Sequence, residues 1–440
     1  MSVCVPSGTD LTNMVACFSS TADKVLVGET EQISGTTAND FSSAVTYTLL
    51  KGDKYNSIKV QVYAFDLPTL WIETPEHATI TSKNAWMEGA GATLYSSGSL
   101  TPLGTTQIKG RGNTTWAYVK KPYTLKLDRK ASILGMPRDR RWNLLANWND
   151  RTDMRTDVAL QLARVSPGLA WTPGGKFVEL ILNGRHIGNY YLCEHIKIAS
   201  DRVNITPIDE YNPEDLTGGY LMEFDTYFDE VNKFRSSLNL PVNLKDPDWT
   251  AGFSINYIRN WVNTLEGKLT AADISSTDYK DYLDIDSYID WWLVHEMTGL
   301  YEPNHPKSSY MYKDREAAQD NRIHAGPCWD FDYYTFVPSV SSKWRVKESI
   351  WYKYLFKDPA FVARAKEKWN AQKFSYEEVA NTYISALAPE LKESADRDKS
   401  IWSCGSINGD QNLSFDDAVA RMQSSLKAKI AWMDSQINTW

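Results

Sequence analysis

The segment AGPCWDFDYYT, residues 325–335, places two carboxylates, Asp330 and Asp332, one residue apart between bulky aromatic rings. It begins with an Ala-Gly-Pro turn, and carboxylates fixed in this way suit a site for a hard cation. The same alternation also fits an ordinary edge strand, with Trp329 and Phe331 turned inward and the acids in water. The segment alone leaves both interpretations open.

Length and composition limit the possible architectures. A chain of 440 residues exceeds the usual single core, so we expect two or three domains. The 42% of hydrophobic residues is typical of a globular protein, and the formal net charge of -8 argues against non-specific binding to nucleic acid or to a membrane surface. The chain has no run of about 18 apolar residues, so we expect no transmembrane segment.

The five cysteines and the chain start add two further limits. No CxxC spacing is present, which argues against a zinc knuckle or a disulfide framework and favours small buried cysteines. The first residues lack the charged and apolar regions of a signal peptide. This leaves either a cytoplasmic protein or one whose signal has been removed.

Residues 1–66 predict a small immunoglobulin-like β-sandwich, because short alternating runs are separated by Gly or Asp turns. Residues 67–440 predict a second domain. Its first part, residues 67–205, has mostly strand patterns, including a hairpin with an Asn183-Gly184 turn. Its second part, residues 206–440, is predicted to be mainly helical, so the expected fold class is α+β with a cleft between a β-rich and a helical lobe.

Apolar residues recur at helical spacing in six segments. The first, residues 149–165, has Asn149 or Asp150 as its candidate cap. The others are residues 257–265, 285–298, 361–369, 376–391 and 415–437.

Two basic elements could contact a phosphate. In IKGRGNTTW, residues 108–116, glycines beside Lys109 and Arg111 would let backbone amides approach an anion, although the GK[ST] ending of a Walker A loop is missing. In KKPYTLK, residues 120–126, strand alternation places Lys126 on the face opposite its leucine neighbours. A solvated edge lysine is the alternative interpretation.

Seven linked motifs, in consistent order, resemble the CotH kinase family, named for a spore coat protein kinase. They are IKGRGNTTW, KKPYTLKLD, ILGMPRDRRWNLLANWNDRTDMRTDVALQLAR, VELILNGRHIGNYYLCEHIKI with DRVNI, GGYLMEFD, HPKSSYMYKD and AGPCWDFD. The resemblance covers about residues 67–440. It implies an atypical protein-kinase-like fold with two lobes, and phosphate transfer from ATP, with Mg or Mn, to serine-rich protein targets.

The resemblance also implies roles for individual residues. Asp330 looks like the metal-binding acid of a kinase DFG motif, and Asp332 is a second ligand or a structural acid. Lys126 resembles the strand lysine that pairs with phosphates, and Lys121 is its rival. Glu194 lies in the segment that resembles the hinge contacting adenine.

The catalytic acid resembles the family pattern less closely. Glu302 aligns with a position where many members carry aspartate, and its extra methylene would shift the carboxylate. Asn304 and Lys307 follow closely enough to be a second metal ligand and a phosphate contact. Lys109 and Arg111 complete the expected nucleotide-binding set.

Two other function classes stay open. Glu302 in place of aspartate would fit a pseudokinase or surface-binding protein, with the N-terminal sandwich presenting the fold. The 17 tryptophans and the acid pair Glu302 and Asp330 would fit a carbohydrate-active enzyme, although most of the tryptophans are better explained as core. By analogy with similar proteins, we expect a secreted or cell-surface location. The sequence does not indicate an oligomeric state.

Overall fold

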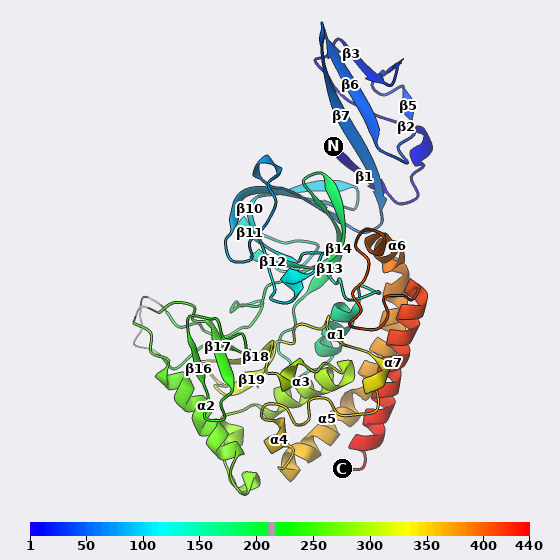
Figure 1. Ribbon diagram of the computed structural model, residues 1–440. Coiled ribbons are helices and arrows are strands. Elements are labelled where there is room, and N and C mark those ends of the chain that lie inside the picture. The colour runs from blue at the N-terminus through cyan, green and yellow to red at the C-terminus, as the bar shows by residue number, and fades with distance from the viewer. Residues whose placement is uncertain (210, 212–215, 251) are drawn as a thin grey trace. The chain divides into compact units, whose positions relative to one another are not determined.

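The computed structural model describes residues 1–209, 211, 216–250 and 252–440, and the chain forms two compact units (Figure 1). The first unit consists of Met1–Ala146 and Lys176–Leu192, and the second of Asn147–Gly175 and Cys193–Trp440. The described chain is a mixed α+β structure, as the sequence predicts. The boundaries at residues 66 and 205 and the two-lobe kinase arrangement stay predictions.

The first unit begins with two small sheets. One has the strand order β1-β7-β6-β3-β4, and the other pairs β2 with β5. Their bounds are β1 Ser2–Pro6, β2 Met14–Val15, β3 Lys24–Val27, β4 Thr30–Glu31, β5 Ala38–Asn39, β6 Val45–Lys51 and β7 Lys54–Phe65. A buried apolar cluster that includes Phe41, Tyr47 and Val62 forms the core, and its immunoglobulin-like character stays a prediction.

A closed barrel follows in the same unit, with the strand order β10-β11-β12-β14-β13-β8-β9. Its strands are β8 Thr69–Glu73, β9 Met87–Ser96, β10 Ser99–Gly110, β11 Tyr123–Ala131, β12 Asp139–Leu145, β13 Gly175–Leu182 and β14 Arg185–Glu194. The predicted hairpin joins β13 to β14, and Asn183 and Gly184 both have positive φ, as a two-residue turn requires. Alternate residues such as Ile108, Leu125 and Trp142 are fully buried.

The second unit combines a five-stranded sheet with several helices. The sheet has the order β16-β17-β15-β18-β19, with β15 Tyr220–Phe224, β16 Lys233–Arg235, β17 Pro241–Asp246, β18 Ser309–Lys313 and β19 Ile323–Ala325. The helices are α1 Arg155–Arg164, α2 Asn256–Leu269, α3 Ile285–Thr298, α4 Tyr352–Leu355, α5 Pro359–Glu378, α6 Ile384–Trp402 and α7 Phe415–Ile437. The prediction of a mainly helical second half is therefore incomplete, because these short strands carry weaker patterns than the helices.

Most predicted helices are present, and α3 and α7 have the predicted bounds. The first helix is an exception, because α1 begins at Arg155 rather than after Asn149 or Asp150. The carboxylate of Asp150 accepts the N–H of Thr152 at 2.9 Å and that of Arg155 at 2.8 Å, so it closes a loop before the helix. Asp153 has a φ of 57°, which an α-helix does not allow.

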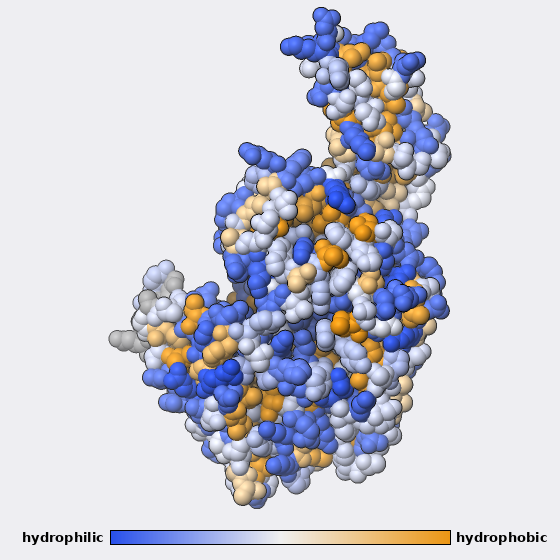
Figure 2. Space-filling model, in the orientation of Figure 1, coloured by the Kyte–Doolittle hydropathy of each residue, from blue (hydrophilic) through white to orange (hydrophobic). Residues whose placement is uncertain are grey.

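The outer surface is mainly polar. Figure 2 shows polar side chains over most of the drawn face, with apolar side chains in separate patches, one of them over the N-terminal sheets. Within the described parts of the chain, none of the helices has the length and apolar character needed to cross a membrane.

Gly110 at the end of β10 offers a direct test of barrel packing. A Cβ at this position would lie 2.3 Å from the ring of Trp116, whereas a Cβ at Gly91 on neighbouring β9 would have no heavy atom within 4 Å. We expect Gly110→Ala to lower the free energy of unfolding by about 1–3 kcal/mol through overpacking. Gly91→Ala, its matched control, should change it by less than about 0.5 kcal/mol. Equal effects in urea unfolding would contradict this packing.

Candidate active site

The position of Glu302 follows from the two ends of helix α3. At its start, the carboxylate of Asp284 accepts the N–H of Ser287 at 2.9 Å and caps the first turn. At its end, Gly299 has a φ of 73°, which glycine adopts without strain, and its N–H closes the last turn. The chain then enters the 3₁₀ turn Glu302–Asn304, whose first residue is the predicted catalytic acid.

The carboxyl group of Glu302 is buried beside other acids. Its Oε2 atom is buried and has no hydrogen-bond partner among the described residues. Burial is the largest cause that raises the pKa of Glu302 to about 9; the negative charges of Asp330 and Asp332 contribute to the rise, and Lys307 opposes it. The structure therefore brings four predicted site residues into one electrostatic neighbourhood, and Glu302 carries a proton near neutral pH.

The segment around Asp330 is a loop, so the edge-strand interpretation is wrong. After β19 the backbone leaves the sheet, and Asp330 has a φ of 69°. Trp329 and Phe331 are buried, as both interpretations required. The Ser308 hydroxyl donates a hydrogen bond to Oδ2 of Asp330 at 3.0 Å. Ser308 was not predicted as a site residue, although it lies in the quoted motif HPKSSYMYKD.

Asp225, directly after strand β15, is a second residue that the sequence did not single out. Its carboxylate accepts the N–H of Tyr227 at 2.7 Å and also the N–H of Ser308. Burial raises the pKa of Asp225. The negative charge of Asp225 in turn helps to raise the pKa of Glu302. The only sequence signal was the motif GGYLMEFD, which ends in this aspartate.

Glu223 on β15, two residues before Asp225, extends the group of buried acids. Burial raises the pKa of Glu223 to about 7, although Lys245 lies 3.2 Å from its carboxylate. The central strand β15 and the residue after it therefore hold two carboxyl groups with raised pKa values.

Asn304 and Lys307 have different surroundings. The Asn304 amide donates to the carbonyl oxygens of Tyr301 at 3.1 Å and Arg345 at 2.8 Å, which fixes the turn and leaves its Oδ1 as the atom able to bind a metal. The Lys307 ammonium lies 4.9 Å from the centre of the Tyr227 ring. The role of Asn304 as a metal ligand stays a prediction.

In the first unit, Lys109 and Lys126 lie on one face of the barrel strands. Lys126 pairs with Gln107 on β10 and with Arg141 on β12, so all three share the face on which Lys109 also lies. Leu125 and Leu127 are fully buried on the opposite face, which confirms the predicted alternation. Burial lowers the pKa of Lys109, and the positive charge of Arg141 lowers it further.

Lys121 has a structural contact that Lys126 lacks. Its ammonium donates to the carbonyl oxygen of Trp116 at 2.8 Å and therefore holds the GRGNTTW loop. The N–H groups of Gly110 and Arg111 donate to the carbonyl oxygens of Ser82 and Pro122, so neither amide is available to an anion. These bonds engage two amides of the loop, and the expected role of its backbone in phosphate binding stays a prediction. Between the rival lysines, this geometry favours Lys126.

Glu194 is engaged inside the second unit. One carboxylate oxygen accepts the N–H of Gly174 at 2.7 Å, and the other lies 3.6 Å from the guanidinium of Arg202. Burial holds the pKa of Glu194 above its usual value, and these two contacts reduce the size of that rise. Its role in nucleotide binding stays a prediction.

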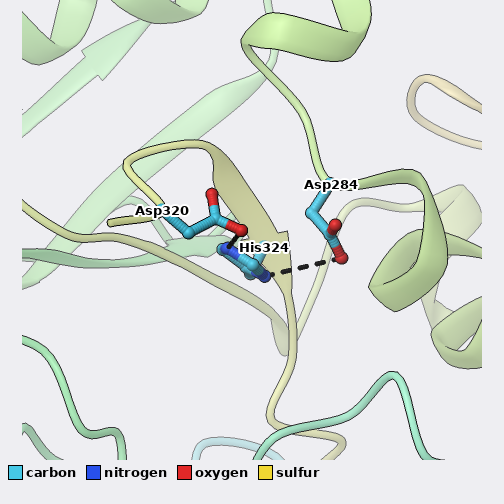
Figure 3. Close-up of side chains that lie close together, drawn as sticks. All are labelled: Asp284, Asp320 and His324. Atoms are coloured by element: carbon cyan, nitrogen blue, oxygen red, sulfur yellow. Dashed lines mark ion pairs between the residues drawn. The ribbon is translucent and has the colours of Figure 1, made fainter. Parts of the chain in front are cut away.

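A separate cluster contains Asp284, Asp320 and His324 (Figure 3). Within the described ranges, these are the three acidic, histidine or cysteine side chains whose ligand atoms all lie within 4.8 Å of one another. The two histidine nitrogens face different acids, at 3.5 Å for Asp284 and 3.3 Å for Asp320. Arg322 lies 2.8 Å and 2.5 Å from the same two acids, so a guanidinium already supplies the positive charge. We interpret this cluster as an ion-pair network at the start of α3.

Comparison with known families agrees with this geometry. The family model described as CotH kinase protein matches residues 108–433. The chain belongs to the CotH kinase family. No curated protein matches the chain. The match makes this a kinase-like protein, and it includes both the barrel lysines and the acids around Glu302.

The oxygen donors of this CotH family member are of the chemical type that suits a divalent cation, although among the described residues the acids around Glu302 do not form a group of three with all ligand atoms within 4.8 Å of one another. The carboxylates of Asp330 and Asp332 and the Ser308 hydroxyl are hard oxygen ligands, and Mg²⁺ usually takes only one or two carboxylates besides phosphate and water. The unpartnered Oε2 of Glu302 and its raised pKa indicate that Lys307 compensates the negative charge at this position only in part. The roles of Asp330 and Asp332 as metal ligands stay predictions.

The buried carboxyl of Glu302 predicts a pH-dependent stability for this CotH family protein. Because its pKa rises from 4.5 to about 9 on folding, the stability that its proton provides is complete below about pH 4.5 and is lost as the pH approaches 9. In EDTA, we expect Glu302→Gln to melt near the wild-type temperature at pH 5 and about 2–4 °C higher at pH 8.5. The exposed Glu348→Gln is the control, and an equal difference at both pH values would contradict the prediction.

Proposed function

We propose that this protein is an ATP- and divalent-metal-dependent protein kinase that transfers phosphate to serine hydroxyls of serine-rich protein targets. The family match supports the kinase class. The observation that supports catalysis most directly is the buried carboxyl of Glu302, which shares one neighbourhood with Asp330, Asp332 and Lys307. Phosphoryl transfer needs such a set, because an acid must orient the hydroxyl while positive charge stabilises the phosphates.

Each residue has a defined part in the proposed reaction. A bound Mg or Mn ion supplies the positive charge that stabilises the phosphate oxygens. Asp330 and Asp332 would bind this ion, and Lys307 would face the transferred phosphate. This positive charge would relieve the repulsion between the acidic side chains. Glu302 then loses its own proton, and its carboxylate accepts the proton of the serine hydroxyl. The serine oxygen then forms a bond to the γ-phosphorus, and the bond to ADP breaks.

The barrel cations are the proposed phosphate contacts of ATP. Lys126 carries a half-buried ammonium on the same strand face as Lys109 and Arg141. A lysine on a β-strand is the usual partner of nucleotide phosphates in kinases. Arg111, Lys121 and Glu194 stay predicted nucleotide contacts with less support, since Lys121 and Glu194 have structural partners.

A pseudokinase or surface-binding protein is the second candidate. Its supporting observation is that Glu302 carries a proton near neutral pH, because a protonated carboxyl cannot accept the serine proton. The carbohydrate-active alternative lacks such support, since Trp291, Trp292 and Trp369 are buried in the core. A secreted or cell-surface location stays a prediction by analogy.

Replacing the acid that we expect to hold the cation tests the proposed kinase directly. With radiolabelled ATP, MnCl₂ and a serine-rich acceptor, we expect Asp330→Asn to lower the transfer rate by at least about 100-fold, because charge stabilisation is lost. Asp320→Asn, in the ion-pair network of Figure 3, should retain the wild-type rate. Undiminished transfer by Asp330→Asn would refute the assignment. ATP binding by the wild type without turnover would instead favour the pseudokinase.

Lys126 provides an independent test of the nucleotide site. Removing its charge in Lys126→Met should raise the KM for ATP about tenfold, which corresponds to about 1.4 kcal/mol of binding free energy. Lys130→Met changes an exposed lysine on the same strand and should leave the KM unchanged. If the two variants have the same KM as the wild type, Lys126 does not contact the phosphates.

A further inference from the structure

The loop that carries Asp330 has a backbone conformation that its sequence disfavours. Asp330, Tyr334 and Phe336 have φ values of 69°, 55° and 52°, and none of them is glycine. Each such residue is strained, and the conformation persists only where surrounding contacts fix it. Phe336 is anchored by its N–H, which donates to the carbonyl oxygen of Thr298 at 2.7 Å. The centre of the loop needs other support.

Asn408 supplies that support from the segment between α6 and α7. Its Oδ1 accepts the N–H of Thr335 at 3.1 Å. Its amide group donates to the carbonyl oxygen of Asp332 at 3.1 Å and to that of Asn149 at 2.9 Å. The side chain is 1% exposed, so water competes weakly for these three hydrogen bonds. One amide therefore holds the loop at two positions and joins it to the segment before α1.

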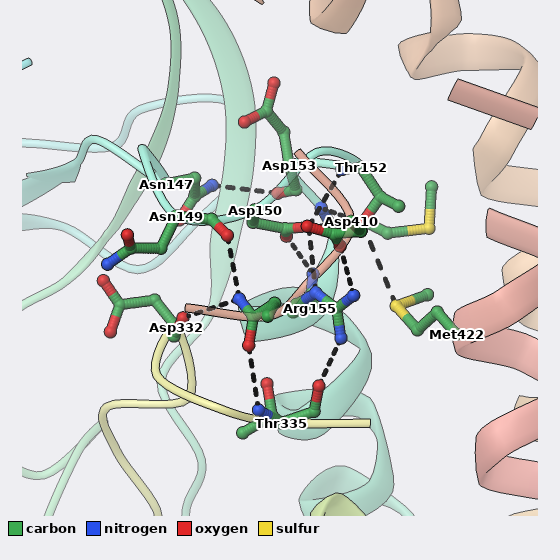
Figure 4. Close-up of polar contacts among 12 residues, drawn as sticks. Asn147, Asn149, Asp150, Thr152, Asp153, Arg155, Asp332, Thr335, Asp410 and Met422 are labelled. Carbon is green, nitrogen blue, oxygen red and sulfur yellow. Dashed lines mark hydrogen bonds and ion pairs between the residues drawn. The ribbon is translucent and has the colours of Figure 1, made fainter. Parts of the chain in front are cut away.

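A buried ion pair fixes the same loop from a second side. The Arg155 guanidinium donates to the carbonyl oxygen of Thr335 and pairs with Asp410 and Asp150 (Figure 4). Both Arg155 and Asp410 are fully buried. Thr335 thus has its N–H and its carbonyl group bound by residues from the same network, which leaves its peptide groups little freedom.

The segment that carries Asn408 is itself anchored. The N–H of Gly405 donates to the carbonyl oxygen of Trp148 at 2.9 Å, and Arg421 on α7 donates to the carbonyl oxygen of Asn408 at 2.9 Å. A Cβ at Gly405 would lie 2.0 Å from Oδ1 of Asn149, so this approach requires glycine. The segment is therefore a rigid support.

We propose that Asn408 is a positioning residue for the metal-binding acids, and that residues 405–410 set the divalent-cation affinity of the site. This inference rests on the proposed function, because it assigns the cation to Asp330 and Asp332. The reasoning is geometric: a ligand loop with three unfavourable φ values binds a cation well only while its neighbours hold it in place. Outer contacts of this kind typically change metal affinity by 10–100-fold.

Direct cation binding tests the proposal without requiring catalysis. Mn²⁺ is titrated into the full-length wild type and Asn408→Asp, and free Mn²⁺ is measured by electron paramagnetic resonance. Asn408→Asp keeps the acceptor oxygen but loses both N–H donors, so we expect Mn²⁺ to bind at least about tenfold more weakly. Asn412→Asp, which alters an exposed asparagine in the same segment, should bind like the wild type. Circular dichroism checks that each variant is folded.

A second variant keeps the test informative if Asn408→Asp does not fold. Arg421→Lys removes the guanidinium whose Nη1 donates to the carbonyl oxygen of Asn408 while changing only a half-buried side chain, and it should weaken Mn²⁺ binding in the same direction. Wild-type Mn²⁺ affinity in the folded variants, or no Mn²⁺ binding by the wild type, would overturn the proposal. Mn²⁺ binding that weakens as expected, with no phosphate transfer by the wild type, would instead refute the proposed kinase activity alone.

Discussion

The second unit must hold several carboxyl groups together with little compensating positive charge. Glu302 and Asp225 have pKa values raised by burial, and like charges add to the rise for Glu302. Ionising such groups in the folded protein costs free energy, because burial removes hydration from the charge and Lys307 offsets this only in part. A cluster of this kind lowers stability where it lies, so contacts elsewhere in the unit must compensate. The frame around the acids is accordingly dense in buried polar bonds.

Helix α7 and the segment before it belong to that frame. Lys429 on α7 lies 3.3 Å from the carboxylate of Glu296 on α3, and both are buried. The same carboxylate accepts the N–H groups of Arg345 at 2.7 Å and Val346 at 2.8 Å. Since Glu302 follows α3 directly, these bonds fix the backbone on which it is carried. Together with Asn408, they make the last part of the chain a structural component of the acid site.

The sequence predicted the elements with strong local signals. Helix α3 has an aspartate cap, a glycine end and apolar residues throughout, and the Asn183-Gly184 turn requires the positive φ that it has. The acid loop was less predictable, because Trp-Asp-Phe-Asp buries its rings equally well in a strand or in an irregular loop. Ser308, Asp225 and Asn408 were missed because their roles depend on partners distant along the chain. Asn408 lies 73 residues from Thr335, and no periodicity encodes such a contact.

Glu302 shows why chemistry is harder to read from sequence than fold. An aspartate one methylene shorter would reach less far into the buried neighbourhood where Oε2 lies without a partner. The longer side chain therefore experiences more of the desolvation that keeps it protonated. A protonated acid avoids burying a negative charge, yet it cannot accept a proton from serine. Whether the residue acts as a base thus depends on the charge brought by ligands, and the identity of the amino acid alone does not decide it.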